Sequence, residues 1–239
     1  MSAPVLLLTA TVTPGSTINT ARADPQVRLQ DYRQALQWWI EHGPCKQIVL
    51  CDSSLTPIAA FAEHVALAAR LGVSFEYLTF QQDFNPHLGK GYGEMGIMEF
   101  AMRHSRMLAE APFVMKATGR YIVRNAALLV DQANTESPDI ICDLREYLTV
   151  ADCRCFIATP SFFTKYLFPR RDLCDDSRES FLEHILARAT HAALADGCAW
   201  RLPLRTLNVS GFGGTRNASM KSGASKYARL LAKRLLLKH

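Results

Sequence analysis

Residues 5–12 read VLLLTATV, a continuous run of apolar and β-branched residues that ends at Thr13-Pro14-Gly15. A run of this kind, closed by a turn signal, predicts a strand that is buried on both faces. The next segment begins at Asp24-Pro25 and continues with helical spacing to about His42, before Gly43-Pro44 interrupts it. The first 44 residues therefore predict a buried strand followed by a helix, which is the repeating unit of a parallel sheet.

Further strand and helix patterns alternate along the chain. Strand patterns occupy residues 47–51, 73–80, 112–123, 139–143, 154–158 and 200–209, and helical patterns occupy 57–71, 94–110, 125–134 and 177–195. The alternation is most regular over the first 125 residues. It predicts an α/β fold in which helices flank both faces of a mostly parallel sheet.

Composition excludes several classes of protein and locates the charge. Of 239 residues, 49% are hydrophobic, which is enough apolar surface to offset the ordering entropy of a folded chain. The formal net charge is +5, but residues 216–239 contain seven Lys or Arg and no acid, so residues 1–215 are mildly acidic. A nucleic-acid partner is therefore not expected.

The charge distribution also suggests a division of the chain. We expect an α/β domain over residues 1–215, a flexible Gly-rich joint over 210–215, and a basic amphipathic helix over 216–239. Within that helix, residues 221–238 would either lie on an anionic membrane surface or dock on their own domain. No stretch reaches the ~18 apolar residues of a spanning helix, so we expect a cytoplasmic protein that can bind the inner face of the membrane peripherally.

The seven cysteines include no CxxC pair. Cys153 and Cys155 are the most closely spaced, without a neighbouring His to complete a zinc site. We expect reduced, buried thiols and no metal ligands among the cysteines.

Ligands of parallel sheets bind beyond the carboxyl ends of the strands. The second strand pattern ends in Asp52-Ser53-Ser54, where a carboxylate would accept hydrogen bonds from a ribose or base, or would cap the next helix. Residues 89–94, GKGYGE, are predicted to form a Gly-rich loop before a helix, in which Gly91 allows close approach, Lys90 supplies charge and Tyr92 a stacking face.

The strongest signal is residues 116–125, KATGRYIVRN, at the end of another strand pattern. Arg120 offers a planar fork for diphosphate oxygens, and Lys116 would add charge neutralisation. The alternative is an internal ion pair, for example with Glu94 or Asp143. We assign the neighbouring polar positions and Arg28 to nucleotide contacts. With Asp52, Ser53, Lys90, Gly91 and Tyr92, the predicted nucleotide site, which becomes the donor site on the resemblance given below, then includes Thr118, Gly119, Tyr121 and Asn125.

A possible general base lies on the predicted helix over residues 177–195, with Ser177 as its N-cap. Glu179 and Glu183 are four residues apart and would share one face. Glu183 lies between Leu182 and Ile185, near the apolar side of the helix, and is our first choice for the base. Glu94 is our second choice.

These motifs occur in one order: Asp-Pro-x-x-Arg from Asp24, a strand ending in Asp-Ser-Ser, GKGYGE, Lys-x-Thr-Gly-Arg-Tyr, and Phe-Leu-Glu on a late helix. The set resembles bacterial glycosyltransferases of surface polysaccharide assembly, over about residues 5–215. The resemblance implies a Rossmann-like, GT-A-type single domain. It also implies transfer of a sugar from a nucleotide-sugar donor to a glycan or lipid-linked glycan in lipopolysaccharide, O-antigen or capsule synthesis.

The chain departs from that family because no Asp-x-Asp metal motif precedes the donor site. A divalent metal stays open as a cofactor, and we expect Lys116 and Arg120 to stabilise the leaving nucleoside diphosphate in its place, with inverting chemistry. The alternative is a non-catalytic nucleotide- or polyanion-binding module that uses the same basic residues without a base.

Overall fold

A computed structural model describes residues 4–15, 21–212 and 219–220. The strands are β1 (Val5–Ala10), β2 (Gln47–Asp52), β3 (Ser74–Thr79), β4 (Val114–Thr118), β5 (Ile122–Val123), β6 (Ile140–Ile141), β7 (Leu144–Arg145), β8 (Val150–Ala151), β9 (Cys155–Ala158), β10 (Trp200–Arg201), β11 (Val209–Phe212) and β12 (Ser219–Met220). The α-helices are α1 (Pro25–His42), α2 (Ala62–Arg70), α3 (Gly89–His104), α4 (Arg106–Ala109), α5 (Ala126–Glu136), α6 (Pro160–Phe162) and α7 (Leu182–Ala195). Shorter 3-10 and π turns occupy Ile58–Phe61, Pro86–Leu88, Phe163–Leu167, Phe168–Leu173 and Asp176–Arg178.

The central sheet has seven strands in the order β10-β6-β9-β4-β1-β2-β3. Strand β1 pairs in parallel with β2 and β4, and β2 pairs in parallel with β3. Strand β9 runs antiparallel to both of its neighbours, β4 and β6. The prediction of a mostly parallel α/β sheet is confirmed, and β9 is the departure that matters for the site.

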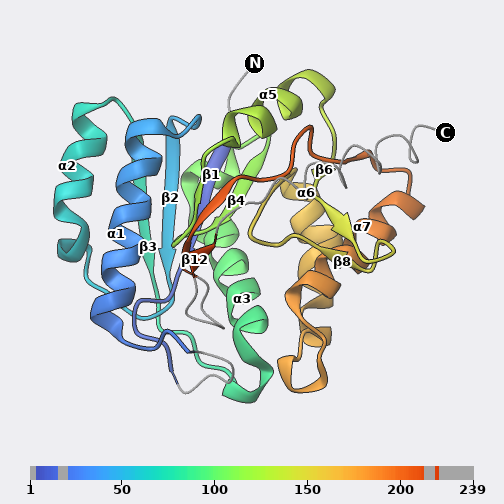
Figure 1. The fold of residues 1–239 in the computed structure, drawn as a ribbon, viewed down its shortest axis with the longest axis horizontal. Helices are drawn as coiled ribbons and strands as arrows, with labels where there is room; N and C mark the ends of the chain where they lie inside the picture. Colours follow the sequence, from blue (N-terminus) through green and yellow to red (C-terminus); the bar gives the residue numbers. More distant parts are fainter. Residues whose placement is uncertain (1–3, 16–20, 213–218, 221–239) are drawn as a thin grey trace.

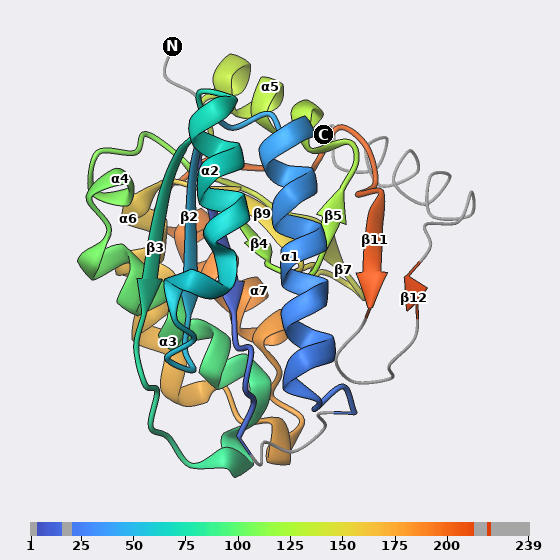
Figure 2. The same ribbon diagram turned by 90° about the vertical axis from the view of Figure 1, so that its left-hand side faces the viewer.

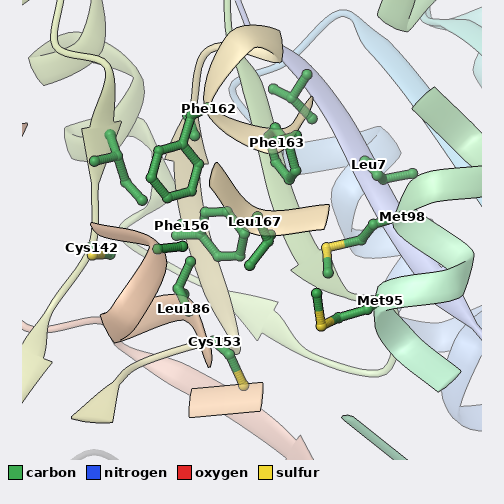
Figure 3. Close-up of a cluster of buried hydrophobic side chains, with 14 of the residues drawn as sticks. Leu7, Met95, Met98, Cys142, Cys153, Phe156, Phe162, Phe163, Leu167 and Leu186 are labelled. Atoms are coloured by element: carbon green, nitrogen blue, oxygen red, sulfur yellow. The ribbon is translucent and has the colours of Figure 1, made fainter. Parts of the chain in front are cut away.

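Two hydrophobic cores separate the sheet from its helices. Helices α1, α2 and α5 lie over one face, whereas α3 and α7 lie over the other (Figures 1 and 2). Along β1, Val5 and Leu7 enter the core under α3, and Leu6 and Leu8 enter the core under α1. Figure 3 shows the α3 side, where Met95 and Met98 approach Leu7 and a cluster of Phe side chains. Because both faces are buried, β1 has the unbroken apolar run that predicted it.

Helix α1 begins as the sequence predicts. The side chain of Asp24 accepts hydrogen bonds from the backbone N–H groups of Gln26 and Val27, and Pro25 occupies the first turn. Gly43 ends the helix, and its N–H donates to the carbonyl of Trp39.

Helix α3 begins five residues earlier than predicted. Residues 89–93 form its first turns and not a loop, so the prediction of a Gly-rich loop is wrong. Single glycines are unfavourable in a helix, but here packing against the segment 174–182 decides the conformation. Helix α3 ends at His104, and Ser105 caps the separate short helix α4.

The late part of the chain also differs from the prediction. Helix α7 begins at Leu182, and Ser177 lies in a 3-10 turn before it, so Ser177 is not the N-cap. Glu179 precedes α7 with a left-handed backbone (φ 57°), so it does not share a helix face with Glu183. Only Trp200 and Arg201 of the predicted strand 200–209 join the central sheet, as β10.

Strand β11 replaces the first part of the predicted joint. It pairs with β5 and β12 in a separate small sheet, visible beside α1 in Figure 2. The division at residue 215 stays a prediction, because the basic segment 221–238 lies outside the described residues. None of the described helices combines the length and apolar composition that crossing a bilayer requires.

Candidate functional site

Two neighbouring pockets open at the edge of the sheet where β1, β2 and β4 end. The smaller has a volume of about 290 Å³ and lies between the residues after β1, the residues after β3 and the first turns of α3. The larger has a volume of about 620 Å³ and lies between α3, the residues before β9 and the start of α7. The two pockets have four lining residues in common, namely Lys90, Glu94, Thr118 and Arg120.

Glu94 is held at this shared wall by three donors. The hydroxyls of Thr9 and Thr118 donate to its Oε1 at 2.6 and 2.9 Å, and Lys116 Nζ lies 2.7 Å from the same atom. Thr9 and Thr118 are register partners on β1 and β4, so the parallel pairing brings the two hydroxyls together. Burial alone would raise the pKa of Glu94, but Lys116 and these hydrogen bonds hold it below its ordinary value.

Lys116 is fully buried and has all three ammonium hydrogens engaged. Its Nζ contacts Glu94 Oε1 and donates to Thr118 Oγ1 at 3.2 Å and to the Cys153 carbonyl at 2.7 Å. Burial is the largest influence on this amine and would lower its pKa, but the charge and hydrogen bond of Glu94, together with Cys153 and Cys155, raise the pKa overall. Lys116 lines neither pocket, so the structure favours the internal ion pair over direct contact with a leaving group.

Arg120, like Lys90, is a cationic residue that lines both pockets. Its side chain is 9% exposed and its Nη1 donates to the Phe212 carbonyl on β11 at 3.2 Å. Its Nε is buried and has no hydrogen-bond partner among the described residues. A buried guanidinium N–H without a partner is costly, and an anionic oxygen in the pocket would satisfy it.

Lys90 and Asp176 define the wall between α3 and α7. Asp176 Oδ2 accepts the backbone N–H of Lys90 at 3.1 Å. Burial raises the pKa of the Asp176 carboxyl, with a further contribution from Glu183. Burial lowers the pKa of Lys90, whose ammonium is attracted to Asp176.

Gly89 makes this contact possible. Its φ is +84°, and a Cβ built on it would lie 2.2 Å from the Asp176 carboxyl. We expect Gly89→Ala to lower the free energy of unfolding by at least about 1 kcal/mol more than Gly197→Ala, in urea titrations. Gly197 is the control for a positive φ, since its φ is +83° and no atom of the described residues lies within 4 Å of a Cβ, so G197A carries backbone strain alone, about 1–2 kcal/mol. Equal losses in the two variants would contradict the packing role of Gly89.

The larger pocket contains the predicted base. Glu183 lies in the first turn of α7 and lines the pocket together with Asp176, His184 and Arg154. A carboxylate in the first turn of a helix is stabilised by the helix dipole. A hydroxyl group bound in this pocket would therefore meet a carboxylate that can accept its proton.

The remaining predicted donor residues fall into two groups. Ser53 and Arg28 line the smaller pocket, and Gly91 and Tyr121 line the larger one. Four others line neither pocket: Asp52, Tyr92, Gly119 and Asn125.

Those four have structural contacts instead. The buried Asp52 carboxylate accepts hydrogen bonds from the backbone N–H groups of Val12, Ser54 and Thr56 at 3.0 Å, so it shapes the loop and does not face a ribose. Tyr92 stacks under the Arg171 guanidinium at 4.2 Å. Asn125 binds the backbone of Thr206 and Asn208, and Gly119 packs against the Thr9 carbonyl.

The sequence predictions missed several pocket residues. Thr9, Tyr32, Arg154 and Asp176 were not singled out, although all four line the pockets. Arg154 immediately precedes β9 and is paired with Asp152 at 2.5 Å. Among the described residues, no group of three or more His, Cys, Asp or Glu side chains is arranged to hold a metal ion.

Comparisons with known proteins identify the class of fold. No family model and no curated protein matches the chain. A mannosyltransferase from Pyrobaculum calidifontis, solved with GDP-Man and Mn²⁺, is similar at a TM-score of 0.50 and 12% identity. The match covers 85% of this chain and 55% of that one, so this chain spans about half of the mannosyltransferase.

Two bacterial structures match at lower TM-scores. A cytidylyltransferase from Leptospira borgpetersenii covers 93% of this chain and 82% of its own, with a TM-score of 0.46 and 12% identity. A nucleoside-diphosphate-sugar pyrophosphorylase from Vibrio cholerae covers 83% and 90%, with a TM-score of 0.47 and 9% identity. At 12% identity the match to the mannosyltransferase establishes the fold alone, which is the Rossmann-like α/β fold that the sequence predicted.

Proposed function

We propose that the protein is a glycosyltransferase that moves a sugar from a nucleotide-sugar donor to a glycan or lipid-linked glycan acceptor. The observation that carries this proposal is Arg120, a nine-tenths buried residue at the wall between two pockets, whose Nε has no hydrogen-bond partner in the described part of the chain. A diphosphate bound there would have its nucleoside in the smaller pocket and its sugar facing the larger one. The solved mannosyltransferase of similar fold, which binds GDP-Man, supports the same class of donor.

The proposed reaction is a single displacement. Glu183 takes the proton of an acceptor hydroxyl, and the acceptor oxygen forms a bond to the anomeric carbon of the donor sugar. The bond between that carbon and the diphosphate oxygen breaks, and the electron pair leaves with the nucleoside diphosphate. Arg120 and Lys90 stabilise the developing charge, whereas Lys116, which we first assigned to this task, neutralises Glu94.

The biological setting is part of the proposal and rests on the motif order in the sequence. Surface polysaccharide synthesis would supply lipid-linked acceptors at the inner face of the membrane. The basic segment 221–238 would then bring the enzyme to anionic lipids.

A ligand screen tests the site class. Nucleoside mono- and diphosphates of uracil, guanine and cytosine are expected to raise Tm, since they bind the folded state alone. Nucleotide sugars are expected to be hydrolysed slowly without an acceptor. Binding without any turnover would favour the non-catalytic module, and formation of pyrophosphate from a nucleoside triphosphate and a sugar phosphate would indicate nucleotidyl transfer.

Replacing Arg120 tests the observation that carries the proposal. We expect Arg120→Met to weaken binding of the best nucleoside diphosphate about 10- to 100-fold by calorimetry, because charge-assisted hydrogen bonds are lost. The matched control is Arg103→Met on α3, whose guanidinium is 70% exposed and paired with Glu99. Unchanged affinity in R120M would contradict the assignment.

A further inference from the structure

Three consecutive residues between β7 and β8 have left-handed backbones. Glu146, Tyr147 and Leu148 have φ values of 50°, 57° and 68°, and none is glycine. Side chains make this conformation unfavourable, and successive residues rarely adopt it. Strain of this kind persists only where the surroundings hold it, and it is concentrated at functional positions.

Contacts on both sides hold this turn. Strands β7 and β8 pair directly, and the Thr149 hydroxyl donates to the Glu146 carbonyl at 2.6 Å. On the side of α7, His191 Nε2 lies 2.8 Å from the Leu148 carbonyl, and the Leu148 side chain packs against the core. The turn is therefore anchored through Leu148 and not through Tyr147.

Tyr147 itself projects into solvent. Its relative exposure is 101%, whereas no other large hydrophobic side chain of the described residues exceeds 55%. The residues around it, Glu146 and Val150, line the larger pocket. A strained but anchored turn thus exposes an aromatic ring on the residue next to Glu146, which lines the pocket that contains Glu183.

A tyrosine presented in this way matches one ligand chemistry well. Its ring offers a flat apolar face with a polar edge, and it has only two side-chain torsions to immobilise. A pyranose has an apolar face of C–H bonds and a rim of hydroxyls, for which the Glu146 carboxylate is a hydrogen-bond acceptor. Because Tyr147 follows a lining residue but does not line the pocket, a sugar ring stacked on it would lie outside the pocket, beside the sugar that occupies it.

We propose that Tyr147 forms an outer acceptor subsite, which stacks on the second sugar ring of an oligosaccharide acceptor. This inference rests on the proposed function and adds the acceptor class, a glycan of at least two rings. A monosaccharide would occupy the pocket without reaching Tyr147.

The test separates this subsite from the donor site. Acceptor KM is measured with p-nitrophenyl glycosides of maltose, chitobiose and mannobiose and with the matching monosaccharide glycosides. Tyr147→Ala is expected to raise KM for the active disaccharide about 3- to 10-fold and to leave KM for the monosaccharide and donor hydrolysis unchanged. Tyr147→Phe retains the stacking face, so it is expected to keep the wild-type KM.

Two further variants control for structure. Leu71→Ala removes another exposed apolar side chain, 43% exposed, on the opposite face of the sheet, and is expected to change no KM. Tyr147→Gly is expected to be more stable than Y147A, because glycine accepts the left-handed conformation, and yet to share its KM defect. An unchanged disaccharide KM in Y147A and Y147G would overturn the subsite, as would a change of molecular mass in light scattering, which would make Tyr147 a contact between copies.

Direct binding makes the result independent of catalysis. Saturation-transfer NMR with maltotriose, chitotriose and mannotriose is expected to detect one of these on the wild type and to lose the signal in Y147A. If no nucleotide sugar is hydrolysed but this difference is seen, the proposed function fails and the glycan subsite stands. If donors are hydrolysed but no trisaccharide binds, the subsite is wrong and the proposed function stands.

Discussion

Glu183→Gln is expected to lower the kcat of sugar transfer by about 10²- to 10⁴-fold, the range that a positioned general base contributes. The amide has nearly the same shape as the carboxylate, but it cannot take the proton of the acceptor hydroxyl. Nucleoside diphosphate affinity should be unchanged, because Glu183 lines only the larger pocket. The measurement is steady-state transfer together with calorimetric binding of the nucleotide.

Glu179→Gln is the matched control for this variant. Glu179 is exposed and lies just before α7, so its replacement removes the same charge from the same segment without altering the pocket. Wild-type turnover in E183Q would remove Glu183 from the mechanism. In that case Glu94, our second choice, is the next candidate for the base, since it lines both pockets.

Lys116→Met is expected to lower the free energy of unfolding by about 3–5 kcal/mol at neutral pH, which is the usual effect of removing one partner of a buried ion pair. Methionine fills most of the lysine volume, so the loss comes mainly from the unpaired Glu94 charge. The contrast is R103M, whose exposed ion pair should contribute less than about 1 kcal/mol. Urea titration of the three proteins measures the difference.

The pH dependence of K116M distinguishes lost charge pairing from lost packing. In the wild type the pKa of Glu94 is lowered, so its contribution is present above the unfolded pKa and is lost as the pH falls through the folded pKa. The pKa of Lys116 is raised, so its contribution is present below the unfolded pKa and is lost as the pH rises through the folded pKa.

In K116M the contribution of Glu94 to stability changes with pH in the opposite direction. Burial without Lys116 raises the folded pKa of Glu94 above the unfolded value, so the variant gains stability as the pH falls through that raised pKa. The difference in the free energy of unfolding between K116M and the wild type should therefore become smaller at acidic pH. At neutral pH, the double variant K116M/E94Q should recover most of the stability that K116M loses. If the difference in the free energy of unfolding does not depend on pH, or if the double variant is no more stable than K116M, then lost packing explains the effect of K116M better than lost charge pairing.

The sequence predicted the parallel half of the fold well, because its signals are local. The run from Val5 to Ala10 is apolar since both faces of β1 are buried, and Asp24-Pro25 caps α1 in the way the residue types suggest. The sequence also predicted three residues of the site, Arg120, Glu94 and Lys90, since polar residues that follow parallel strands converge on one edge of the sheet.

The parts that the sequence could not predict depend on contacts between distant segments. Residues 89–93 read as a loop because glycine disfavours helix, yet Gly91 lies where a Cβ would be 2.8 Å from Cys174 Sγ. The sequence of α3 itself does not indicate that Cys174 packs against Gly91. Lys116 was assigned to the leaving diphosphate, with an internal ion pair as the alternative, and only the position of β4 relative to Glu94 favours the ion pair.

Arg154 was missed for a topological reason. Ligand sites were sought after the carboxyl ends of strands, but β9 is antiparallel to β4, and Cys155 pairs with Ala117. The amino end of β9 therefore lies at the edge where β4 ends, and the residues before β9 reach the site. No periodicity in the chain reveals the direction of a four-residue strand.

Because β9 runs in the reverse direction, the two pockets are lined by different parts of the sequence. The smaller pocket is built entirely from residues 9–120, whereas the larger one combines α3 and the strand end at 118–121 with residues 146–184. On the proposed function, residues 9–120 contact the nucleoside of the donor, whereas residues 146–184 contact only the transferred sugar and the acceptor. Exchange of residues 142–184 between related chains would then change the sugars that are joined while the nucleotide of the donor stays the same, a form of modular inheritance within one domain.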